Sequence, residues 1–362
     1  MPIKEQSFRI GCGRYTQGQG ILAACGSEIQ RLGNAPLIIG GATALSLTRK
    51  TIVESISAVC NKYEIVPHTG TCNEQRAKEL AELAAREGYD VIVGIGGGVL
   101  CDFAKLCGYF AKRPVINIPT SSATCAAYTP LSVRYTPEGR TVGSLHYPYE
   151  VDAVIVDTAI VGRQPVRLFL AGVFDSLAKF IEIKQRFDEN TAAYPIGLDW
   201  AYIMSQYSYK QLCEKTGSCL RAMEAGEITE DLENVLFTLI AATGVISGIA
   251  RGSNQCALAH KFYESTRSLF HETARPYLHG EIVGVGLLLQ NHFNGEPENN
   301  AMLLELMKKH NMPYRVTDIG ITKDDRTRSA YYEKLCNSSA IDKTNADECT
   351  RLDAALQYLW AL

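Results

Sequence analysis

Short β-rich runs alternate with amphipathic helical patterns through roughly the first 160 residues of this 362-residue chain. Asn73 is placed to cap one helical pattern, whose apolar residues follow the spacing of a single helical face, and Gly88 is placed to end it. Strands that alternate with helices on short connections form a parallel sheet covered on both faces. The first half is therefore predicted to be an α/β domain, with a hairpin formed by Leu131–Tyr135 and Thr141–His146. The predicted strands of the sheet lie at 35–40, 64–68, 90–95, 115–118 and 153–156.

The sequence changes in character after Pro165. Strand patterns cease and long helical patterns follow, among them Leu232–Ala250, which is apolar on nearly all sides and is therefore expected at the centre of its bundle. The chain is also long enough for two domains. We predict a Rossmann-like nucleotide-binding α/β domain over residues 1–162 and an all-helical domain over residues 163–362, with a cleft between them.

The charge balance and the cysteines limit the classes of function. Lys and Arg number 36 against 39 Asp and Glu, so we expect no basic surface for nucleic acid or for a membrane. No apolar stretch is expected to span a bilayer, and the first residues lack the apolar core of a signal peptide. Twelve cysteines without a C-x-x-C pair are typical of buried thiols in a reducing cytoplasm. Composition thus favours a cytoplasmic enzyme or binding protein.

A glycine-rich turn, Gly94–Gly98, follows a strong strand pattern and opens a helix. Without side chains, the backbone N–H groups of such a turn can approach a pyrophosphate, and the helix N-terminus adds partial positive charge. The spacing is not G-x-G-x-x-G, so a simple tight turn is the alternative.

A second loop, Pro119–Thr129, is crowded with small hydroxyl residues, including Ser121, and also follows a strand end. Ligands of open α/β sheets bind beyond the carboxyl ends of the strands, so the two loops together favour a nucleotide site. On the helix between them, Asp102 and Lys105 share one face. They are explained either by this site or by a surface ion pair.

Three polar residues of the helical half have apolar or helical surroundings, namely Asp175, His260 and His279. An ionised carboxylate in an apolar helix is costly unless it is paired or binds a cation. One Asp and two neutral imidazoles suit Zn²⁺ or Fe²⁺ and leave a coordination position for a substrate. Since 85 residues separate Asp175 from His260, the spacing leaves open that these are two core histidines and a capping Asp.

Four segments together resemble the glycerol dehydrogenase branch of the iron-containing (group III) alcohol dehydrogenase family: Gly94–Lys105, Pro119–Tyr135, Val154–Leu177 and the His-Gly-Glu at 279–281. The resemblance spans roughly residues 8–320. It implies a dehydroquinate synthase-like architecture, NAD(P)(H) as cofactor and one divalent metal ion. By position it makes Asp175, His260 and His279 the metal ligands, and hence the catalytic residues of a helical metal-binding domain. It also implies dinucleotide contacts at Gly96, Gly97, Gly98, Thr120, Thr129, Leu131 and Tyr135.

One departure from that branch concerns the substrate. Cys125 stands where glycerol dehydrogenases carry an Asp that meets the polyol. The change removes an acceptor for a substrate hydroxyl and also a repulsion against an anionic substrate. The surrounding loop is closer to the hydroxycarboxylate dehydrogenase subgroup, whose members resemble glycerol dehydrogenase but reduce 2-oxo acids.

Two further departures concern the cofactor and the proton. Gly40–Ala42 occupies the place where NAD-preferring members often have an acidic residue, and Arg49 or Lys50 lies near enough in sequence to meet a 2′-phosphate. We therefore expect NADPH to be accepted. Many relatives carry a second His one turn after the first His ligand, whereas this chain has Lys261–Glu264 there, so its proton handling must differ.

We predict a metal-dependent, NAD(P)-linked oxidoreductase that interconverts a small alcohol or 2-hydroxy acid and its carbonyl compound by hydride transfer, as a cytoplasmic homo-oligomer. The alternatives are a glycerol or other polyol dehydrogenase, a glycerol-1-phosphate dehydrogenase (loosely suggested by Ser253–Glu264), a dehydroquinate synthase-like lyase, and a nucleotide-binding protein without activity. The lyase needs an additional cluster of basic residues, which the sequence does not offer near Asp175 or His260. The intact triad opposes the inactive protein.

Overall fold

The computed structural model describes residues 10–137, 139–186, 196–250 and 255–362. Contacts divide the chain into two compact units. Unit 1 comprises Met1–Pro165 and Lys215–Gly248, and unit 2 comprises Val166–Glu214 and Ile249–Leu362.

Unit 1 is built on a six-stranded parallel sheet with the strand order β1-β8-β5-β4-β2-β3. Every residue of β2, β4, β5 and β8 is buried, as expected for continuous apolar runs in a parallel sheet. β6 and β7 form the separate antiparallel hairpin that the sequence predicted; residue 138, in its turn, lies outside the described residues. The strands are β1 (Tyr15–Gly18), β2 (Pro36–Gly40), β3 (Glu64–Pro67), β4 (Val91–Gly96), β5 (Val115–Pro119), β6 (Leu131–Tyr135), β7 (Thr141–His146) and β8 (Ala153–Asp157).

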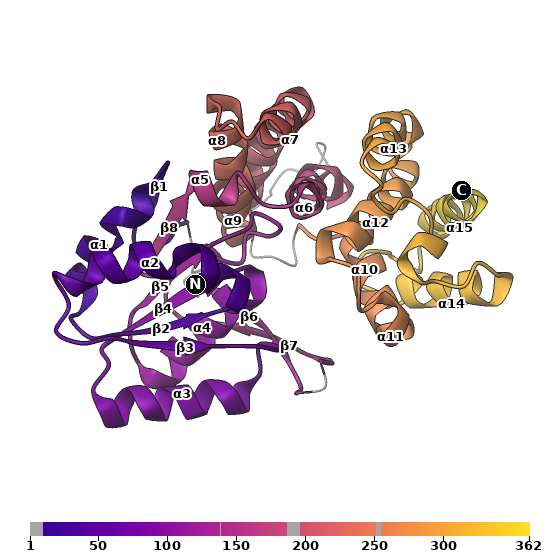
Figure 1. Ribbon diagram of the computed structural model, residues 1–362. Helices are drawn as coiled ribbons and strands as arrows, with labels where there is room; N and C mark the ends of the chain where they lie inside the picture. Colours follow the sequence, from indigo (N-terminus) through magenta and orange to yellow (C-terminus); the bar gives the residue numbers. More distant parts are fainter. Residues whose placement is uncertain (1–9, 138, 187–195, 251–254) are drawn as a thin grey trace, which may run out of the picture. The chain divides into compact units, whose positions relative to one another are not determined.

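Helices cover both faces of this sheet, which confirms the predicted α/β class. Figure 1 shows α1 and α2 on one side of the strands and α3 on the other. Asn73 caps α3 by accepting a hydrogen bond from the backbone N–H of Arg76, and Gly88 ends it in the left-handed conformation. The sequence analysis missed β1, which extends the sheet by pairing with β8. The helices on the sheet are η1 (Ile21–Ala24), α1 (Cys25–Leu32), α2 (Ala42–Ser57), α3 (Glu74–Glu87), α4 (Gly98–Ala111) and α5 (Thr158–Val161).

Part of the helical half of the sequence belongs to unit 1. A continuous helical stretch is formed by α8 (Glu230–Phe237), the π-helical η2 (Thr238–Ala242) and α9 (Thr243–Ile249). The side chain of Gln17 donates to the carbonyl oxygen of Glu233, and Thr158 Oγ1 donates to the Glu233 carboxylate. These contacts explain why residues 215–248 group with the sheet, although the sequence analysis assigned everything after residue 162 to a second domain. The assignment of the two domains to nucleotide and metal stays a prediction.

The same stretch corrects the expectation about membrane-spanning segments. Glu230–Ile249 has a mean hydropathy of 1.6, so by length and composition it is apolar enough to cross a membrane. Most of it, 61%, is buried within the protein, and its backbone packs against Tyr128 at Gly244. It is a core helix, as the analysis of Leu232–Ala250 predicted.

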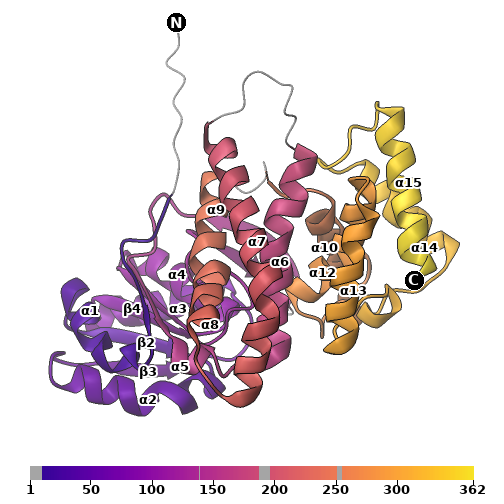
Figure 2. The same ribbon diagram turned by 90° about the horizontal axis from the view of Figure 1, so that it is seen from above.

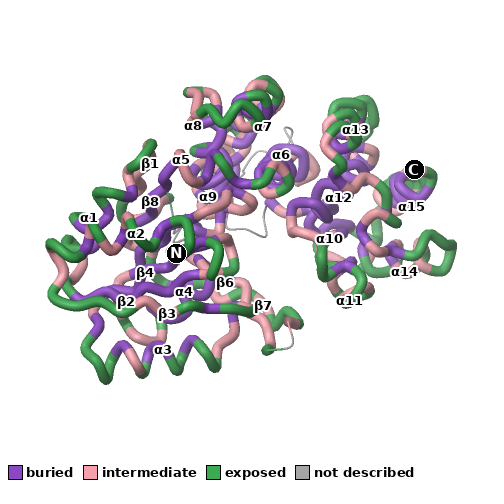
Figure 3. The backbone as a smooth tube through the Cα atoms, in the orientation of Figure 1, coloured by how far each residue is buried: buried purple, intermediate pink, exposed green. Residues whose placement is uncertain are grey.

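Unit 2 is helical throughout its described residues, which confirms the predicted all-helical character. Its centre is α12, which packs against α6, α10 and α15 and is buried along nearly its whole length (Figure 3). α14 and α15 lie side by side next to the C-terminus (Figure 2). The helices are α6 (Val166–Arg186), α7 (Ile196–Ala225, shared with unit 1), α10 (Leu258–Leu269), α11 (His271–Ala274), α12 (His279–Phe293), η3 (Pro297–Asn299), α13 (Asn300–Lys309), η4 (Thr317–Ile319), α14 (Asp325–Cys336) and α15 (Ala346–Ala361).

Candidate functional site

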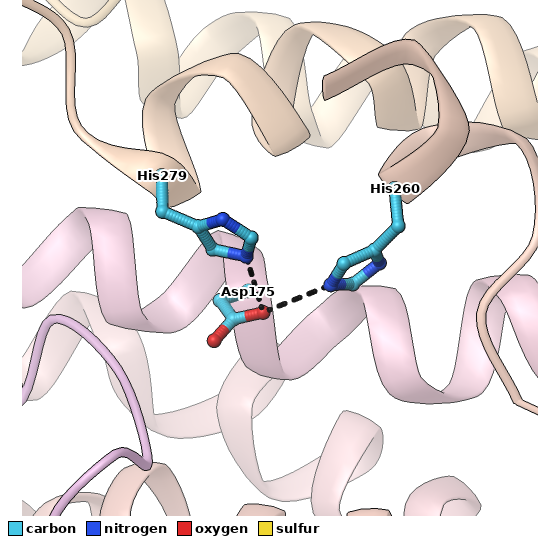
Figure 4. A group of neighbouring side chains, drawn as sticks. All are labelled: Asp175, His260 and His279. Carbon is cyan, nitrogen blue, oxygen red and sulfur yellow. Dashed lines mark ion pairs between the residues drawn. The ribbon is translucent and has the colours of Figure 1, made fainter. Parts of the chain in front are cut away.

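Asp175, His260 and His279 come together in unit 2 from three different helices, α6, α10 and α12 (Figure 4). Oδ1 of Asp175 lies 3.4 Å from Nε2 of His260 and 3.5 Å from Nε2 of His279. The three potential ligand atoms lie within 4.8 Å of one another. Asp175 lies 85 positions before His260 and 104 positions before His279, yet the three residues present one oxygen and two nitrogens to a single point.

Two more charged residues of α6 face this point, and the sequence analysis did not single them out. Lys179 Nζ lies 3.6 Å from Asp175 Oδ1, and the Glu182 carboxylate contacts His260. Asp175, Lys179 and Glu182 follow the i, i+4, i+7 spacing of one helical face. Because all three are charged within a mostly buried helix, that spacing was a usable signal. The sequence analysis expected no cluster of basic residues near Asp175, and Lys179 is a single basic residue there.

Both oxygens of the Glu182 carboxylate contact His260 or the start of its helix and so hold the ring in position. Oε1 accepts hydrogen bonds from the backbone N–H groups of Ala257 (2.9 Å) and His260 (2.8 Å), at the start of α10. Oε2 lies 2.5 Å from His260 Nδ1. Gln290 of α12 accepts from the N–H groups of Leu258 and Ala259 and completes the cap. With Nδ1 engaged by Glu182, the Nε2 atom of His260 is directed at Asp175.

Close packing of α12 on α6 positions His279. A Cβ atom on Gly280 would lie only 1.9 Å from the carbonyl oxygen of Ala171, so only glycine allows this approach. Glu281 accepts a hydrogen bond from the N–H of Leu278 at 2.7 Å and forms a bidentate ion pair with Arg167. The ring of Tyr263 lies edge-on to His279, with 4.3 Å between centroids. Tyr263 comes from the Lys261–Glu264 segment, where many relatives were expected to carry a His.

Burial and neighbouring charges together set the ionisation of these groups. Burial alone would raise the pKa of Asp175, but the Lys179 ammonium and the two imidazoles hold this pKa well below its ordinary value. Burial likewise opposes the charge on Glu182, and the His260 ring outweighs it, so the Glu182 pKa is lowered. Burial lowers the pKa of His279, which favours the neutral imidazole with a free lone pair.

In unit 1, the glycine turn lies at the point where the strand order reverses. The chain runs outward from β2 to β3, returns to the other side of β2 at β4, and continues to β5. The turn after β2 and the turn after β4 are therefore neighbours, with the N–H of Gly41 donating to the carbonyl oxygen of Ile95. Such a switch point is where open α/β sheets bind ligands beyond the carboxyl ends of their strands.

The hydroxyl-rich loop lies directly against the glycine turn. Gly96 ends β4, Gly97 is the N-cap residue of α4, and Gly98 begins that helix. A Cβ atom on Gly98 would lie 2.6 Å from Thr124 Oγ1, and one on Gly97 would lie 3.3 Å from Ser121 Oγ. The N–H of Thr120 donates to the carbonyl oxygen of Gly96. The structure thus brings the two predicted nucleotide loops together.

Asp102 and Lys105 form a buried ion pair of 2.9 Å, not a surface pair. Lys105 Nζ also donates to the carbonyl oxygens of Ala126 (2.7 Å) and Thr129 (2.8 Å) and to that of Leu131. Asp102 accepts from the N–H of Val133. The pair therefore fastens α4 to the end of the hydroxyl loop, and any contact of Asp102 with a cofactor stays a prediction.

The remaining predicted residues of this site lie on the same loop or on the hairpin that follows it. Cys125 is buried, and its carbonyl oxygen accepts from the N–H groups of Tyr128 and Thr129. Leu131 and Tyr135 begin and end β6 and are half-buried. Ser253 and Asn254, which suggested glycerol-1-phosphate dehydrogenase, lie outside the described residues.

Comparison with known proteins now identifies the chain. Residues 12–158 match the family model of iron-containing alcohol dehydrogenase. A glycerol dehydrogenase from Pseudomonas putida is 33% identical over 321 residues, which cover 87% of this chain and 86% of that protein. The chain belongs to the iron-containing alcohol dehydrogenase family. This confirms the resemblance seen in the sequence and makes the protein an oxidoreductase that acts on alcohol groups.

Two further comparisons extend this result. Hydroxycarboxylate dehydrogenase A from Escherichia coli (strain K12) is 29% identical over 257 residues, which cover 70% of this chain and 68% of that protein. The crystal structure of a probable glycerol dehydrogenase from Sinorhizobium meliloti 1021 superposes with a TM-score of 0.81 at 23% identity and covers 99% of both chains. The structural match supports the fold, an α/β part followed by a helical part.

Membership of the family implies a nicotinamide dinucleotide and a divalent metal ion, and the residues of unit 2 fit such an ion. Oδ1 of Asp175 is completely buried and accepts no hydrogen bond from the described part of the chain. A buried carboxylate oxygen without a donor is costly, and a cation removes that cost. One carboxylate oxygen and two imidazole nitrogens form a ligand set typical of Zn²⁺ and of Fe²⁺.

Proposed function

We propose that this protein is a metal-dependent, NAD(P)-linked dehydrogenase whose substrate is a small 2-hydroxy acid, interconverted with its 2-oxo acid. Asp175, His260 and His279 would hold one divalent ion, Zn²⁺ or Fe²⁺. The observation that carries the proposal is the buried Asp175 Oδ1, which has no hydrogen-bond donor among the described residues and lies 3.4–3.5 Å from two imidazole nitrogens.

Each of the surrounding residues has a defined part in this site. A divalent ion bound here would supply Lewis-acid catalysis at the substrate oxygen. Although burial opposes this, Glu182 and Asp175 together raise the pKa of His260 well above its ordinary value. When a metal ion displaces the proton on Nε2, Glu182 would accept the remaining Nδ1 proton and so hold the ring in the tautomer whose Nε2 binds the ion. Gly280 and the Arg167–Glu281 pair hold the start of α12, and with it His279, in place.

The dinucleotide would bind at the switch point of the sheet in unit 1. The backbone of Gly96, Gly97 and Gly98 would meet the pyrophosphate at the N-terminus of α4. The other predicted contacts, on the adjoining loop and hairpin, are Asp102, Thr120, Ser121, Thr129, Leu131 and Tyr135. Because β2 ends at Gly40 and is followed by Gly41 and Ala42, which offer no carboxylate against a 2′-phosphate, NADPH should be used at least as well as NADH.

Cys125 supports an acid rather than glycerol as the substrate. A thiol replaces the carboxylate that glycerol dehydrogenases are expected to use at this position, so a repulsion against an anionic substrate is absent. The second candidate function is a glycerol dehydrogenase. It is favoured by relatives of that name from Pseudomonas putida and Thermotoga maritima, at 33% and 31% identity.

The test is a turnover assay with the purified, metal-loaded protein. Nicotinamide absorbance would be followed with 2-hydroxy acids, glycerol, other diols and glycerol phosphate, each with NAD and with NADP. We expect 2-hydroxy acids to be oxidised fastest, and faster oxidation of glycerol would overturn the interpretation of Cys125. A strong preference for NAD over NADP would contradict the argument from Gly40.

A variant and two further measurements complete this test. Asp175→Ala should lose both the bound metal and turnover; retention of both would refute the assigned ligands. Elemental analysis of protein purified without added metal distinguishes zinc from iron. We further propose a cytoplasmic homo-oligomer, for which light scattering of the purified protein should give a mass above the 39.7 kDa of one chain.

A further inference from the structure

Two cysteine thiols of unit 2 are in contact, although the sequence shows no close cysteine pair. Cys336 is the last residue of α14, and Cys349 lies near the start of α15. Their Sγ atoms are 3.7 Å apart, and both side chains are half-buried free thiols. A disulfide bond has its sulfurs about 2.0 Å apart. The two sulfurs therefore need to approach by only roughly 1.6 Å to form one.

Helix packing holds the two thiols together. α14 and α15 lie side by side (Figure 2) and also pack on α10 and α12, respectively. Leu335 precedes Cys336 on α14, Leu352 follows Cys349 on α15 by three positions, and both leucines are fully buried. The cysteines thus sit beside anchored residues, at helix ends that are joined by a short exposed segment. Their sulfurs can approach without moving the buried parts of either helix.

The surface beside the pair gives a small reagent access to one of the two thiols. A hollow of about 460 Å³ opens between α14 and α15. The described residues that line it include Cys349 but not Cys336; they are Arg328, Ser329, Tyr332, Cys349, Thr350 and Asp353. Cys349 is therefore the thiol that an incoming reagent meets first.

The groups around the sulfurs suit Cys336 to the second step of a thiol exchange. Burial and the hydrogen bond with Cys349 raise the pKa of Cys336, while the Tyr332 hydroxyl and the Lys343 ammonium act in the opposite direction. Burial and contacts with both sulfurs raise the pKa of Tyr332 to about 12, so its hydroxyl keeps its proton and can donate to a thiolate. Cys336 thus stays a thiol until a bond on Cys349 is ready to be displaced.

We propose that Cys336 and Cys349 are a modification site, at which a low-molecular-weight disulfide such as oxidised glutathione forms a reversible disulfide bond that fastens α14 to α15. In a reducing cytoplasm the two residues rest as thiols, and the bond forms when the pool of disulfide rises. The inference does not depend on the metal site or on the substrate.

The reaction is two successive thiol–disulfide exchanges. The Cys349 thiolate attacks one sulfur of oxidised glutathione, so a Cys349–glutathione bond forms, the glutathione disulfide breaks, and the first glutathione leaves and takes up a proton. The Cys336 thiolate then attacks the Cys349 sulfur, so the protein disulfide forms and the second glutathione leaves in the same way. The two protein thiols lose two protons and two electrons, which reduce oxidised glutathione to two thiols.

Peptide mapping by mass spectrometry tests the proposal on the full-length, metal-loaded protein. After incubation with oxidised glutathione, the wild type should yield a cross-linked peptide that joins Cys336 to Cys349 and lacks two hydrogen atoms. Dithiothreitol should restore both thiols. Glutathione that stays attached to Cys349 of the wild type would overturn the proposal, and so would the absence of any reaction at the two cysteines.

Serine variants test the order of the two steps. Cys336→Ser removes the second thiol, so glutathione should stay attached to Cys349. Cys349→Ser should slow modification at Cys336 by at least about 10-fold, because an exposed thiol reacts faster than a shielded one. Cys213→Ser, at a half-buried position of α7, is the control and should form the cross-link as the wild type does. Equal reaction rates at Cys336 with and without Cys349 would contradict the assigned order. If a variant fails to fold by circular dichroism, the wild-type peptide map decides alone.

Thermal unfolding tests whether the bond fastens the two helices. The cysteines are 13 positions apart, and closing a loop of this length restricts the unfolded chain. The midpoint of the oxidised wild type should exceed that of the reduced protein by roughly 3–10 °C. The same treatment should not raise the midpoint of Cys336→Ser. Equal midpoints for oxidised and reduced wild type would contradict the fastening. None of these measurements involves turnover, so they decide the inference whether or not the proposed function holds.

Discussion

Glu182 determines which ring nitrogen of His260 can bind a metal ion. Its carboxylate contacts Nδ1 of His260 and two backbone N–H groups at the start of α10. A carboxylate behind a metal-binding imidazole fixes its tautomer and raises its basicity. We expect Glu182→Gln to weaken Zn²⁺ binding by about 10- to 100-fold in a chelator competition assay near neutral pH. Glu305→Gln, on the exposed side of α13, is the control. Equal zinc affinity in both variants would mean that Glu182 only caps the helix.

A second prediction at the residue scale concerns pH and His68 in unit 1. This ring is buried, stacks on Phe103 at 3.8 Å between centroids, and has its pKa lowered below 6.5 by burial. At a pH between the lowered pKa of folded His68 and the ordinary pKa of the unfolded chain, the unfolded chain binds a proton at this residue and the folded chain does not. The free energy of unfolding is therefore highest above about pH 6.5 and decreases as the pH falls through the unfolded-state pKa of this histidine.

The urea midpoint of the wild type should decrease from pH 7.5 to 5.5, about the range in which histidine titrates. His68→Asn should lose stability at the higher pH and show a flatter profile, whereas exposed His146→Asn should behave as the wild type does. A parallel decrease in all three proteins would exclude His68 as the cause.

At the scale of elements, the contact between α6 and α12 determines whether His279 reaches Asp175. The start of α12 can approach α6 because residue 280 has no side chain, and an added Cβ would meet the Ala171 carbonyl oxygen at 1.9 Å. Because that atom belongs to the backbone, one of the helices must shift. We expect Gly280→Ala to reduce zinc affinity by at least about 10-fold and to lower the free energy of unfolding by about 1–3 kcal/mol, as overpacking does. Chelator competition and urea unfolding measure the two effects.

The control for this prediction is another helical glycine. A Cβ atom on Gly217 in α7 would lie 3.7 Å from Nη1 of Arg221, an ordinary van der Waals contact, so Gly217→Ala should leave zinc affinity unchanged. It should stabilise the helix by up to about 1 kcal/mol, because alanine has the higher helix propensity. Wild-type zinc affinity in Gly280→Ala would contradict the role of this helix contact.

At the scale of the whole molecule, the proposed metal ligands all belong to unit 2. A ligand that binds only the folded state stabilises it by about 2.7 kcal/mol at 100 times its dissociation constant. Removing the ion with a chelator should therefore speed amide hydrogen exchange in α6, α10 and α12. Exchange in β4 and β5 of unit 1 should change much less. Equal acceleration in both units would show that the ion stabilises the chain as one cooperative structure.

The sequence by itself determined the elements and the kinds of chemistry. The strands β2, β4, β5 and β8 were predictable because a central parallel strand has a nearly continuous apolar run, and α3 because its cap and its terminal glycine are local signals. Asp175 was recognisable because a carboxylate in an apolar helix needs a cation or a partner. Each of these inferences depends on neighbours in the chain, which a periodicity can reveal.

Only the tertiary structure decided which distant residues meet. Asp175, His260 and His279 lie on three helices, and no local pattern specifies that α12 contacts α6 closely enough to bring them together. Lys179 and Glu182 acquire their roles from the same packing, as does the Asp102–Lys105 pair, which is buried because the loop from Ala126 to Leu131 folds over it. β1 pairs with β8, and residues 215–248 join the sheet unit through contacts that include Gln17 with Glu233, 216 positions apart. Contacts at such separations depend on how the surfaces of whole helices and strands pack together. That packing involves many side chains far apart in the chain, so no local sequence pattern specifies it.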